Sequence, residues 1–273
     1  VCERFVKNKR AMIALVIFLI IALMAIFGPM ISPYSYDGMD TAIMNQRPSA
    51  AHWFGTDRFG RDLFTRVLYG ARISLMVGIV TAVINTIIGV IYGGIAGYVG
   101  GRVDMWMMRL TDILYSIPEL LYIILIMLIF GSNVRSIIIG VCVAGWISMA
   151  RMVRSQIITL KEQEFALAAF VLGANSRRIL FKHLIVNSLG TIIVTVTLMI
   201  PQAIFMEAFL SFVGVGISAP MASLGTLAQD ARTYLEIFPY QMLFPVAAIC
   251  VTIFSLNFIG EGLNSALNPK GKR

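Results

Sequence analysis

The segment EFALAAFVLGANSRRILFKH (residues 164–183) lies inside residues 151–186, the one long charged interval between apolar blocks in the second half of the chain. Its first part has a helical period, because four apolar residues fall on one face of a helix. These residues are Phe165, Ala168, Ala169 and Leu172. The period predicts a short helix, and the rest of the sequence is suited to holding that helix at a membrane surface.

A break follows this helix at Gly173. Glycine readily takes the left-handed conformation that ends helices, and Asn175 or Ser176 can accept hydrogen bonds from the first free amides of a following helix. That second helix carries basic side chains beside apolar ones. They are Arg177, Arg178 and Lys182, with Ile179, Leu180 and Leu184.

Side chains at Ala166, Ala169 and Gly173 are so small that a partner's backbone or aromatic ring can approach the first helix closely. A docking element for another protein is therefore one interpretation of the segment. The other is an amphipathic helix that lies on lipid headgroups. Spacing alone leaves both interpretations open.

The composition excludes an ordinary soluble domain, because 58% of the residues are hydrophobic and only 13% are charged. The chain is a polytopic membrane protein. Its formal net charge of +8 does not indicate nucleic-acid binding, because the basic residues flank apolar blocks instead of forming an aromatic-interleaved patch. Anionic lipid and membrane topology explain the charge better.

The sequence shows no catalytic or metal-binding pattern. Cys2, Cys142 and Cys250 have no ligand-like spacing, so neither a disulfide nor a metal site is predicted. No phosphate loop ending in Gly-Lys-Ser/Thr, paired catalytic carboxylates or nucleophile elbow occurs. We therefore expect a protein that is not an enzyme and does not hydrolyse ATP itself.

Apolar blocks predict six membrane spans, of which the first is long enough to cross a hydrocarbon core of about 30 Å. They lie at residues 11–31, 73–98, 104–130, 136–150, 188–210 and 240–263. Pro118 predicts a kink in the third span. A cleaved signal peptide is the alternative for the first block, but that block exceeds a usual signal core and lacks a small-x-small cleavage site.

Glycines recur every fourth residue along the second span and just beyond it, at Gly89, Gly93, Gly97 and Gly101. Such a ridge permits close helix packing. A phosphate-cradling loop is the alternative for clustered glycines, but the lysine and hydroxyl residue that such a loop needs do not follow. The glycines therefore predict a packing surface.

The distribution of basic residues predicts the orientation in the membrane. With six spans, fifteen of the 22 Lys and Arg residues lie on the side of the amino terminus, including Lys270, Lys272 and Arg273 near the chain's end. Because cytoplasmic loops carry the excess of positive charge, both termini and residues 151–186 are expected in the cytoplasm. Residues 32–72 and 212–239 are then external, the latter partly re-entrant.

Residues 151–186 resemble the cytoplasmic "EAA" loop of binding-protein-dependent ABC importer permeases. Ala168, Ala169 and Gly173 match its pattern in register, and His183 stands where the peptide-transporting branch usually has His. The sequence departs from the pattern at Leu167, where the family has Glu, and at Val186, where it has Pro.

Other blocks make the resemblance specific and extend it over most of the chain. They are His52-Trp-Phe-Gly-Thr-Asp57, Gly60-Arg-Asp62, Tyr69-Gly-Ala-Arg-Ile-Ser74, Glu207-Ala-Phe-Leu-Ser-Phe-Val-Gly214 and Asn257-Phe-Ile-Gly-Glu-Gly-Leu263. Together they look like the C-type permease subunit of dipeptide, oligopeptide and nickel importers.

The resemblance implies an all-α polytopic fold of the type I ABC importer permease, with six transmembrane helices and a cytoplasmic two-helix coupling loop at residues 151–186. Residues 1–72 would hold the first transmembrane helix and an external segment, and residues 73–268 the importer's transmembrane domain. It also implies a multi-pass protein of the bacterial inner membrane that forms half of a translocation pore for oligopeptides or dipeptides.

The partners implied are a B-type permease subunit, two cytoplasmic ATPases, an extracytoplasmic substrate-binding protein and the lipid bilayer, with no nucleic acid. ATP would be bound by the ATPases, so this chain would need no cofactor. ATPase coupling would fall to Glu164, Leu167, Ala168, Ala169, Gly173, Arg177 and His183. Glu164 would replace the charge that Leu167 lacks, since the two positions lie one helical turn apart.

Two carboxylates within or at the edge of apolar blocks, Glu119 and Glu207, are candidates for the pathway or its gate. For Glu207 the blander interpretation is a structural hydrogen bond to the neighbouring permease subunit. The external segment has two interpretations as well: a collar that meets the substrate receptor, or a salt-bridged cover over the first helices. Its arginines and aspartates favour the second; they are Arg47, Arg58, Arg61, Arg66, Arg72, Asp37, Asp40, Asp57 and Asp62.

Two other functions remain as alternatives. An importer of the same family for nickel or another small cargo is possible, although the sequence shows no metal-ligand cluster. A secondary transporter or channel belongs to a different class, and it would need more ionisable groups along a pathway than the apolar blocks contain.

Overall fold

The computed structural model describes residues 2–267 as helices and connecting loops. Lys270, Lys272 and Arg273 lie outside the described residues. The elements are α1 (Cys2–Val6), α2 (Lys9–Ile31), η1 (Thr41–Ile43), α3 (Leu63–Val99), α4 (Gly101–Ser116), α5 (Glu119–Phe130), α6 (Val134–Ala144), α7 (Trp146–Lys161), α8 (Glu164–Val171), α9 (Ser176–Arg178), η2 (Ile179–Leu184), α10 (Ile185–Val213), α11 (Leu224–Arg232) and α12 (Tyr240–Leu267).

Within the described residues, five helical segments are long and apolar enough to cross a membrane, and the bent pair α4 and α5 makes a sixth if it counts as one span. The five are Lys9–Ile31, Leu63–Val99, Val134–Lys161, Ser176–Val213 and Tyr240–Leu267. The bend between α4 and α5 is 73°, and it occurs at Pro118, as the sequence predicts. The all-α polytopic fold is confirmed.

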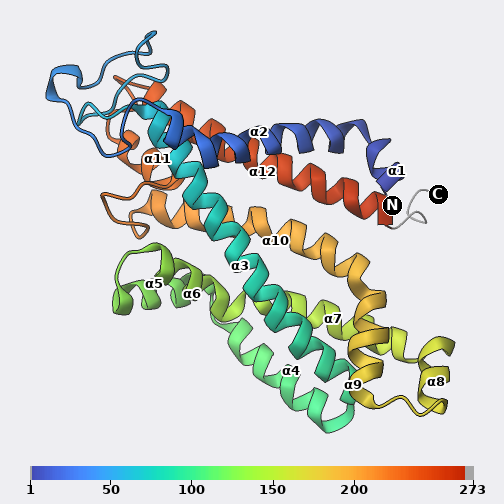
Figure 1. Cartoon of the computed structure of the whole chain (residues 1–273). Helices are drawn as coiled ribbons and strands as arrows, with labels where there is room; N and C mark the ends of the chain where they lie inside the picture. Colours follow the sequence, from blue (N-terminus) through green and yellow to red (C-terminus); the bar gives the residue numbers. More distant parts are fainter. Residues whose placement is uncertain (1, 268–273) are drawn as a thin grey trace.

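The long helix α3 runs obliquely through the molecule, from the end that holds α11 to the end that holds α9, and it contacts α2, α7 and α10 extensively (Figure 1). Its most extensive contact is with α7. Three of the four predicted ridge glycines make this contact possible: an added Cβ would lie 2.6 Å from Met149 at Gly89, 2.1 Å from the Ala150 carbonyl oxygen at Gly93 and 2.8 Å from the Arg154 carbonyl oxygen at Gly97. Gly101 is different, because it starts α4 and has no neighbour within 4 Å of such a Cβ.

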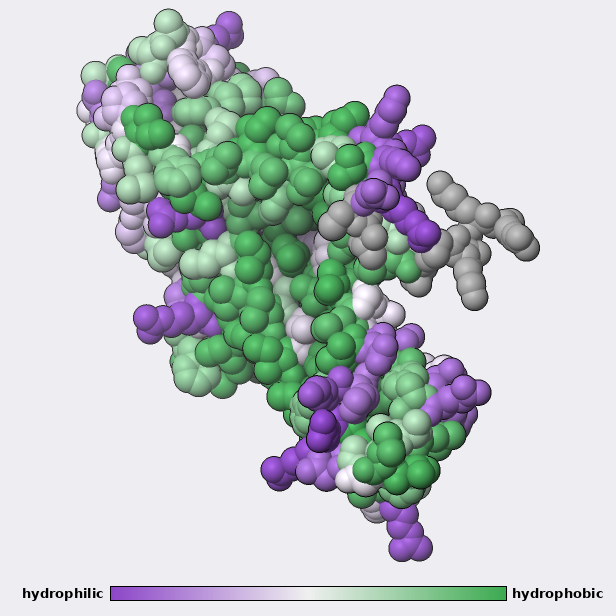
Figure 2. Space-filling model, turned by 45° about the vertical axis from the view of Figure 1, so that its right-hand side comes forward, coloured by the Kyte–Doolittle hydropathy of each residue, from purple (hydrophilic) through white to green (hydrophobic). Residues whose placement is uncertain are grey.

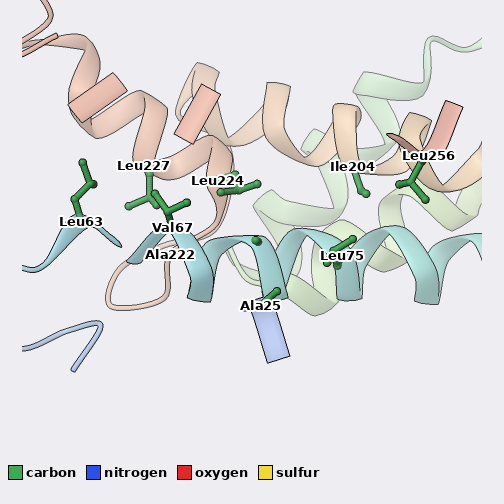
Figure 3. Close-up of a cluster of buried hydrophobic side chains, with 10 residues drawn as sticks. Ala25, Leu63, Val67, Leu75, Ile204, Ala222, Leu224, Leu227 and Leu256 are labelled. Carbon is green, nitrogen blue, oxygen red and sulfur yellow. The ribbon is translucent and has the colours of Figure 1, made fainter. Parts of the chain in front are cut away.

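A cluster of buried apolar side chains joins α2, α3, α10, α11 and α12 (Figure 3). Leu63 and Val67 of α3 point toward Leu224 and Leu227 of α11 in this cluster. The short helix α11 is therefore packed onto the long helices by its own apolar face. The predicted external connection at residues 212–239 contains this buried helix.

Several predicted boundaries differ from the structure. Helix α3 begins at Leu63, not at residue 73, so the predicted division between residues 72 and 73 falls inside one helix. Arg66 was predicted to lie in the external segment, but the structure places it in α3. Its guanidinium group donates there to the Tyr36 carbonyl oxygen at 3.1 Å. Helix α7 continues to Lys161, and η2 continues directly into α10, so both flanks of the predicted loop extend the spans.

We expect Gly93→Ala to lower the thermal stability of the protein in detergent, because the new methyl group would overlap the Ala150 carbonyl group. Overpacking of this kind costs about 1–3 kcal/mol. The adjacent Gly94→Ala is the matched control, since its Cβ would meet nothing nearer than 3.6 Å. Equal unfolding temperatures for the two variants would show that the contact of α3 with α7 is not as tight as described.

Candidate functional site

The predicted two-helix element is present between α7 and α10. Helix α8 ends at Val171, and Gly173 two residues later has φ +81°. The amides of Gly173 and Ala174 donate to the carbonyl oxygens of Phe170 and Ala169. This is the hydrogen-bond pattern of a left-handed glycine cap. The Asn175 side chain then accepts from the Arg178 amide at 2.8 Å and begins the next helix. The predicted turn chemistry is confirmed.

The inner face of α8 packs against the chain's own core. Ala166 is buried, and Ala169 is half-buried against a cluster that contains Ile179, Leu180 and Leu184. Small side chains are needed here because α8 lies directly on these residues. The small residues predicted as a partner's contact surface thus serve in part, at Ala166 and Ala169, to hold α8 on the body of the protein.

The outer face of α8 is apolar and exposed. Leu167 is 54% exposed, Phe170 70%, Val171 82% and Leu172 86%. Figure 2 shows hydrophobic residues enclosed by hydrophilic ones on the lower lobe, which holds α8 and α9. Phe170 and Val171 are not among the predicted coupling residues, although their hydrophobicity within a charged interval was a visible signal.

The other residues predicted for ATPase coupling lie along the same element. Ala168 and Gly173 are exposed beside the apolar outer face, and Glu164 is exposed in the first turn of α8. Arg177 is exposed in α9. His183 is half-buried in η2, a π-helical turn at the base of α10. The structure brings the first six onto one lobe, with His183 at its root.

Ion pairs fasten α4 to α7 close to this lobe. Two of the guanidinium nitrogens of Arg154, Nε and Nη2, each donate to a carboxylate oxygen of Asp104 at 2.5 Å. Arg151 donates to Asp112 at 2.9 Å and stacks over the ring of Tyr115. Because α7 leads directly into α8, these pairs connect the position of α8 to that of α4.

A cavity of about 580 Å³ lies among α3, α4, α5, α6, α7, α10 and α12. Its lining combines apolar walls with the polar side chains Asn85, Tyr115, Ser148, Gln202 and Asn257. Glu119, at the start of α5, is the one charged residue among those that line it. These neutral polar residues could not be grouped from the sequence, because they come from five separate helices.

The two carboxylate candidates differ in their surroundings. Glu119 lines the cavity, as a pathway residue would. Glu207 is fully buried in α10 and does not line it. Its carboxylate accepts from Ser74 of α3 at 2.6 Å and from Ser211 at 2.8 Å. The hydrogen bonds expected across a subunit boundary are thus made within the chain.

The segment predicted to be external, residues 32–72, contains an arginine–aspartate pair of the predicted kind and a histidine–aspartate contact that was not predicted. Arg61 donates to Asp57 at 2.6 Å, and His52 Nδ1 lies 2.9 Å from Asp62. The segment is also tied to α12, because the Tyr240 hydroxyl donates to the Gln46 carbonyl oxygen at 2.8 Å. Within the described residues, no three His, Cys, Asp or Glu side chains gather as a potential metal site.

Comparison with known proteins gives two family matches. Residues 89–273 match the family described as "Binding-protein-dependent transport system inner membrane component". Residues 1–48 match the "N-terminal TM domain of oligopeptide transport permease C". The two matches together cover the first span and the chain from the last third of α3 onward.

Several named relatives are similar over nearly the whole chain. The chain is 49% identical to the "Oligopeptide transport system permease protein OppC" of Bacillus subtilis, over 98% of this chain and 88% of the relative. It is 48% identical to the "Dipeptide transport system permease protein DppC" of the same organism, over 99% and 85%. It is 46% identical to the OppC protein of Escherichia coli K12, over 99% and 90%.

The geometry around Glu207 predicts that Glu207→Leu destabilises the isolated permease, because two buried serine hydroxyls lose their acceptor. The expected cost is about 1–3 kcal/mol, measured as a lower unfolding temperature in detergent without partner subunits. Glu207→Gln retains an acceptor oxygen and serves as the control, with a smaller effect expected. A Glu207→Leu chain that is as stable alone as the wild type, and fails only in assembly, would contradict the intramolecular role.

Proposed function

The chain belongs to the family of inner membrane components of binding-protein-dependent transport systems, and we propose that it forms half of the translocation pore of an ABC importer for oligopeptides or dipeptides. As a membrane-spanning permease subunit, it is a transporter component and not an enzyme. Membership in this family implies ATPase and binding-protein partners. Membership in this family also argues against a secondary transporter.

The relatives' names support peptide as the cargo. Three relatives of nearly full length are named as oligopeptide or dipeptide transport permeases. The comparisons give the nickel alternative no support. We therefore assign peptides as the cargo class.

The arrangement we propose has three kinds of protein partner. A related B-type permease completes the pore, two cytoplasmic ATPases bind and hydrolyse ATP, and one extracytoplasmic binding protein delivers peptide. This chain then needs no cofactor of its own. The cavity of about 580 Å³ fits a pore half, because its neutral polar lining can replace water around a peptide without fixing one side-chain type.

The observation that carries the proposal is the exposed apolar outer face of α8. A solvent-exposed patch of Leu167, Phe170, Val171 and Leu172 is costly in water and typical of a protein contact. The basic residues of α7 and α9 around it favour a cytoplasmic position. Docking of this face into an ATPase groove satisfies both observations.

The way in which α8 is held explains how docking can drive the pore. Its inner face is packed on η2, and η2 runs into α10, which lines the cavity. On the other side α7 leads into α8 and carries Ser148 of the cavity wall. A displacement of α8 by moving ATPases is therefore transmitted to two cavity-lining helices as a rigid-body motion.

We propose a topology in which both termini and α8 are cytoplasmic. Helix α1, the end of α12 and the lobe of α8 lie toward the same end of the molecule, and the external segment and α11 lie toward the other (Figure 1). Residues 1–72 then comprise the first span, an external cover and the first turns of α3, and residues 73–268 comprise the rest of the importer's transmembrane domain with the coupling loop at 151–186. Because α3 crosses that division, the two parts fold as one unit.

Phe170→Ala is expected to reduce ATPase association and peptide-dependent ATP hydrolysis roughly tenfold or more, as loss of a central aromatic contact does at other interfaces. Phe130→Ala is the matched control, because Phe130 is also a largely exposed phenylalanine but lies at the far end of α5. ATPase copurification and hydrolysis in proteoliposomes measure the effect. Normal coupling in Phe170→Ala, or an equal loss in Phe130→Ala, would refute docking through α8.

The topology predicts which engineered cysteines react with an impermeant thiol reagent in intact cells. In a background without native cysteines, Ser49→Cys is expected to react and Asn175→Cys is not, although both positions are exposed in the structure. Permeabilised cells provide the control, since Asn175→Cys should then react. Labelling of Asn175→Cys in intact cells would overturn the proposed orientation.

A further inference from the structure

A second cavity, of about 380 Å³, lies on the proposed external face, where six parts of the chain meet. The segment before α3, the first turns of α3, the connection of α5 to α6, the end of α10, the connection of α10 to α11, and α11 itself all contribute to it. Its polar lining includes Arg58, Arg61, Arg66, Ser132, Gln229 and Asp230. None of its lining residues lines the central cavity.

Positive charge exceeds negative charge in this cavity. Three arginine side chains line it, and Asp230 is the one acidic residue among the lining. The Asp230 carboxylate lies 3.8 Å from the guanidinium group of each arginine, which is beyond hydrogen-bond distance. Asp57, behind the cavity, is already bonded to Arg61 at 2.6 Å. Of the two carboxylates that lie within 4 Å of the three guanidinium groups, Asp57 and Asp230, only Asp57 is at hydrogen-bond distance.

The most buried of these arginines lacks part of its hydrogen bonding. Arg66 is 2% exposed, and its Nε has no hydrogen-bond partner, with the nearest carboxylate, of Asp57, at 3.6 Å. Buried polar groups are rarely left without a partner in a folded protein. Arg58 and Arg61 are held in place by Phe59, whose ring lies under both guanidinium groups at 4.6 and 4.7 Å. The cavity is therefore preorganised and incompletely neutralised.

We propose that this cavity is a receptor site for a carboxylate, supplied by an acidic side chain of the extracytoplasmic binding protein when that protein docks. Arginine is suited to this role because its planar fork can bind a carboxylate through two hydrogen bonds. An entering carboxylate makes the close contacts that Asp230 at 3.8 Å does not. The inference rests on the proposed function, in which a binding protein meets this face.

The position and size of the cavity favour the binding protein over the transported peptide as the source of the carboxylate. The cavity is separate from the central one, so peptide need not pass through it. A volume of about 380 Å³ admits a side chain and some backbone but not an oligopeptide. Arg58 is 42% exposed at the side chain, so the site is reachable from outside.

The test measures the affinity of the importer's own binding protein for the complete importer in nanodiscs of phosphatidylcholine. Arg58→Glu is expected to weaken binding roughly tenfold or more, because it places a like charge against the incoming carboxylate. Arg135→Glu is the matched control, since Arg135 is an exposed arginine at the start of α6 that does not line the cavity. It should bind within about twofold of the wild type.

Asp230→Asn provides a test in the opposite direction. It removes the carboxylate that competes for the three arginines, so the binding protein should bind more tightly, with a steeper loss of affinity as salt is added. A role of Asp230 in folding alone would predict a lower unfolding temperature without tighter binding. An affinity at or below that of the wild type would contradict the proposal.

A charge exchange identifies the partner residue. Among single Asp→Lys and Glu→Lys variants of the binding protein, one should restore binding to the Arg58→Glu importer and weaken binding to the wild type. Equal losses of affinity in Arg58→Glu and Arg135→Glu would overturn the assignment and indicate a general effect of surface charge. An Arg58→Glu effect that appears only when anionic lipid is added would also overturn it and indicate a lipid site. Peptide uptake by the wild-type importer tests the proposed function separately.

Discussion

The close contact between α3 and α7 is the constraint on which the rest of the structure depends. Gly93 brings the backbones of the two helices together, because even one methyl group there would overlap the Ala150 carbonyl group. In lipid, where helices gain little hydrophobic energy by meeting, such small-residue contacts are a main source of association. Because α7 is fixed along α3, the end of α7 has a fixed position, and α8 follows directly from it. The same contact positions Ser148 of α7 in the cavity wall.

Glu207 and Glu119 show two ways in which a carboxylate in an apolar segment is accommodated. Glu207 is fully buried, and Ser74 and Ser211 donate hydrogen bonds to it within the chain. Glu119 lines a cavity, where it keeps access to water or cargo. A carboxylate without either environment would be costly at this depth. Burial and hydrogen bonding, not position in the sequence, therefore separate a structural carboxylate from a pathway candidate.

Much of the fold was predictable from the sequence because membrane spans depend on composition and local turn chemistry. Gly173, Asn175 and Pro118 each act on their nearest neighbours, and each does what its chemistry predicts. The start of α3 was not predictable in this way. A charged residue such as Arg66 indicates a loop until its partner, the Tyr36 carbonyl oxygen thirty residues earlier, is known. The cavity lining was hidden for the same reason, because neutral residues such as Asn85 and Gln202 acquire meaning only when separate helices converge.

The substitution of Leu167 for the family's usual glutamate is better understood with the two faces of α8 in view. Ala166 and Ala169 are committed to the chain's own core, so the surface left for a partner is formed by Leu167 and the exposed apolar residues after it. A leucine at this position extends that apolar surface, whereas a glutamate would interrupt it. The charge remains available at Glu164, in the first turn of α8, where the helix dipole favours a carboxylate. Apolar contact and charge are thus divided between successive turns of one short helix, and a partner groove with an apolar floor and a basic rim at the amino-terminal end of α8 would fit both.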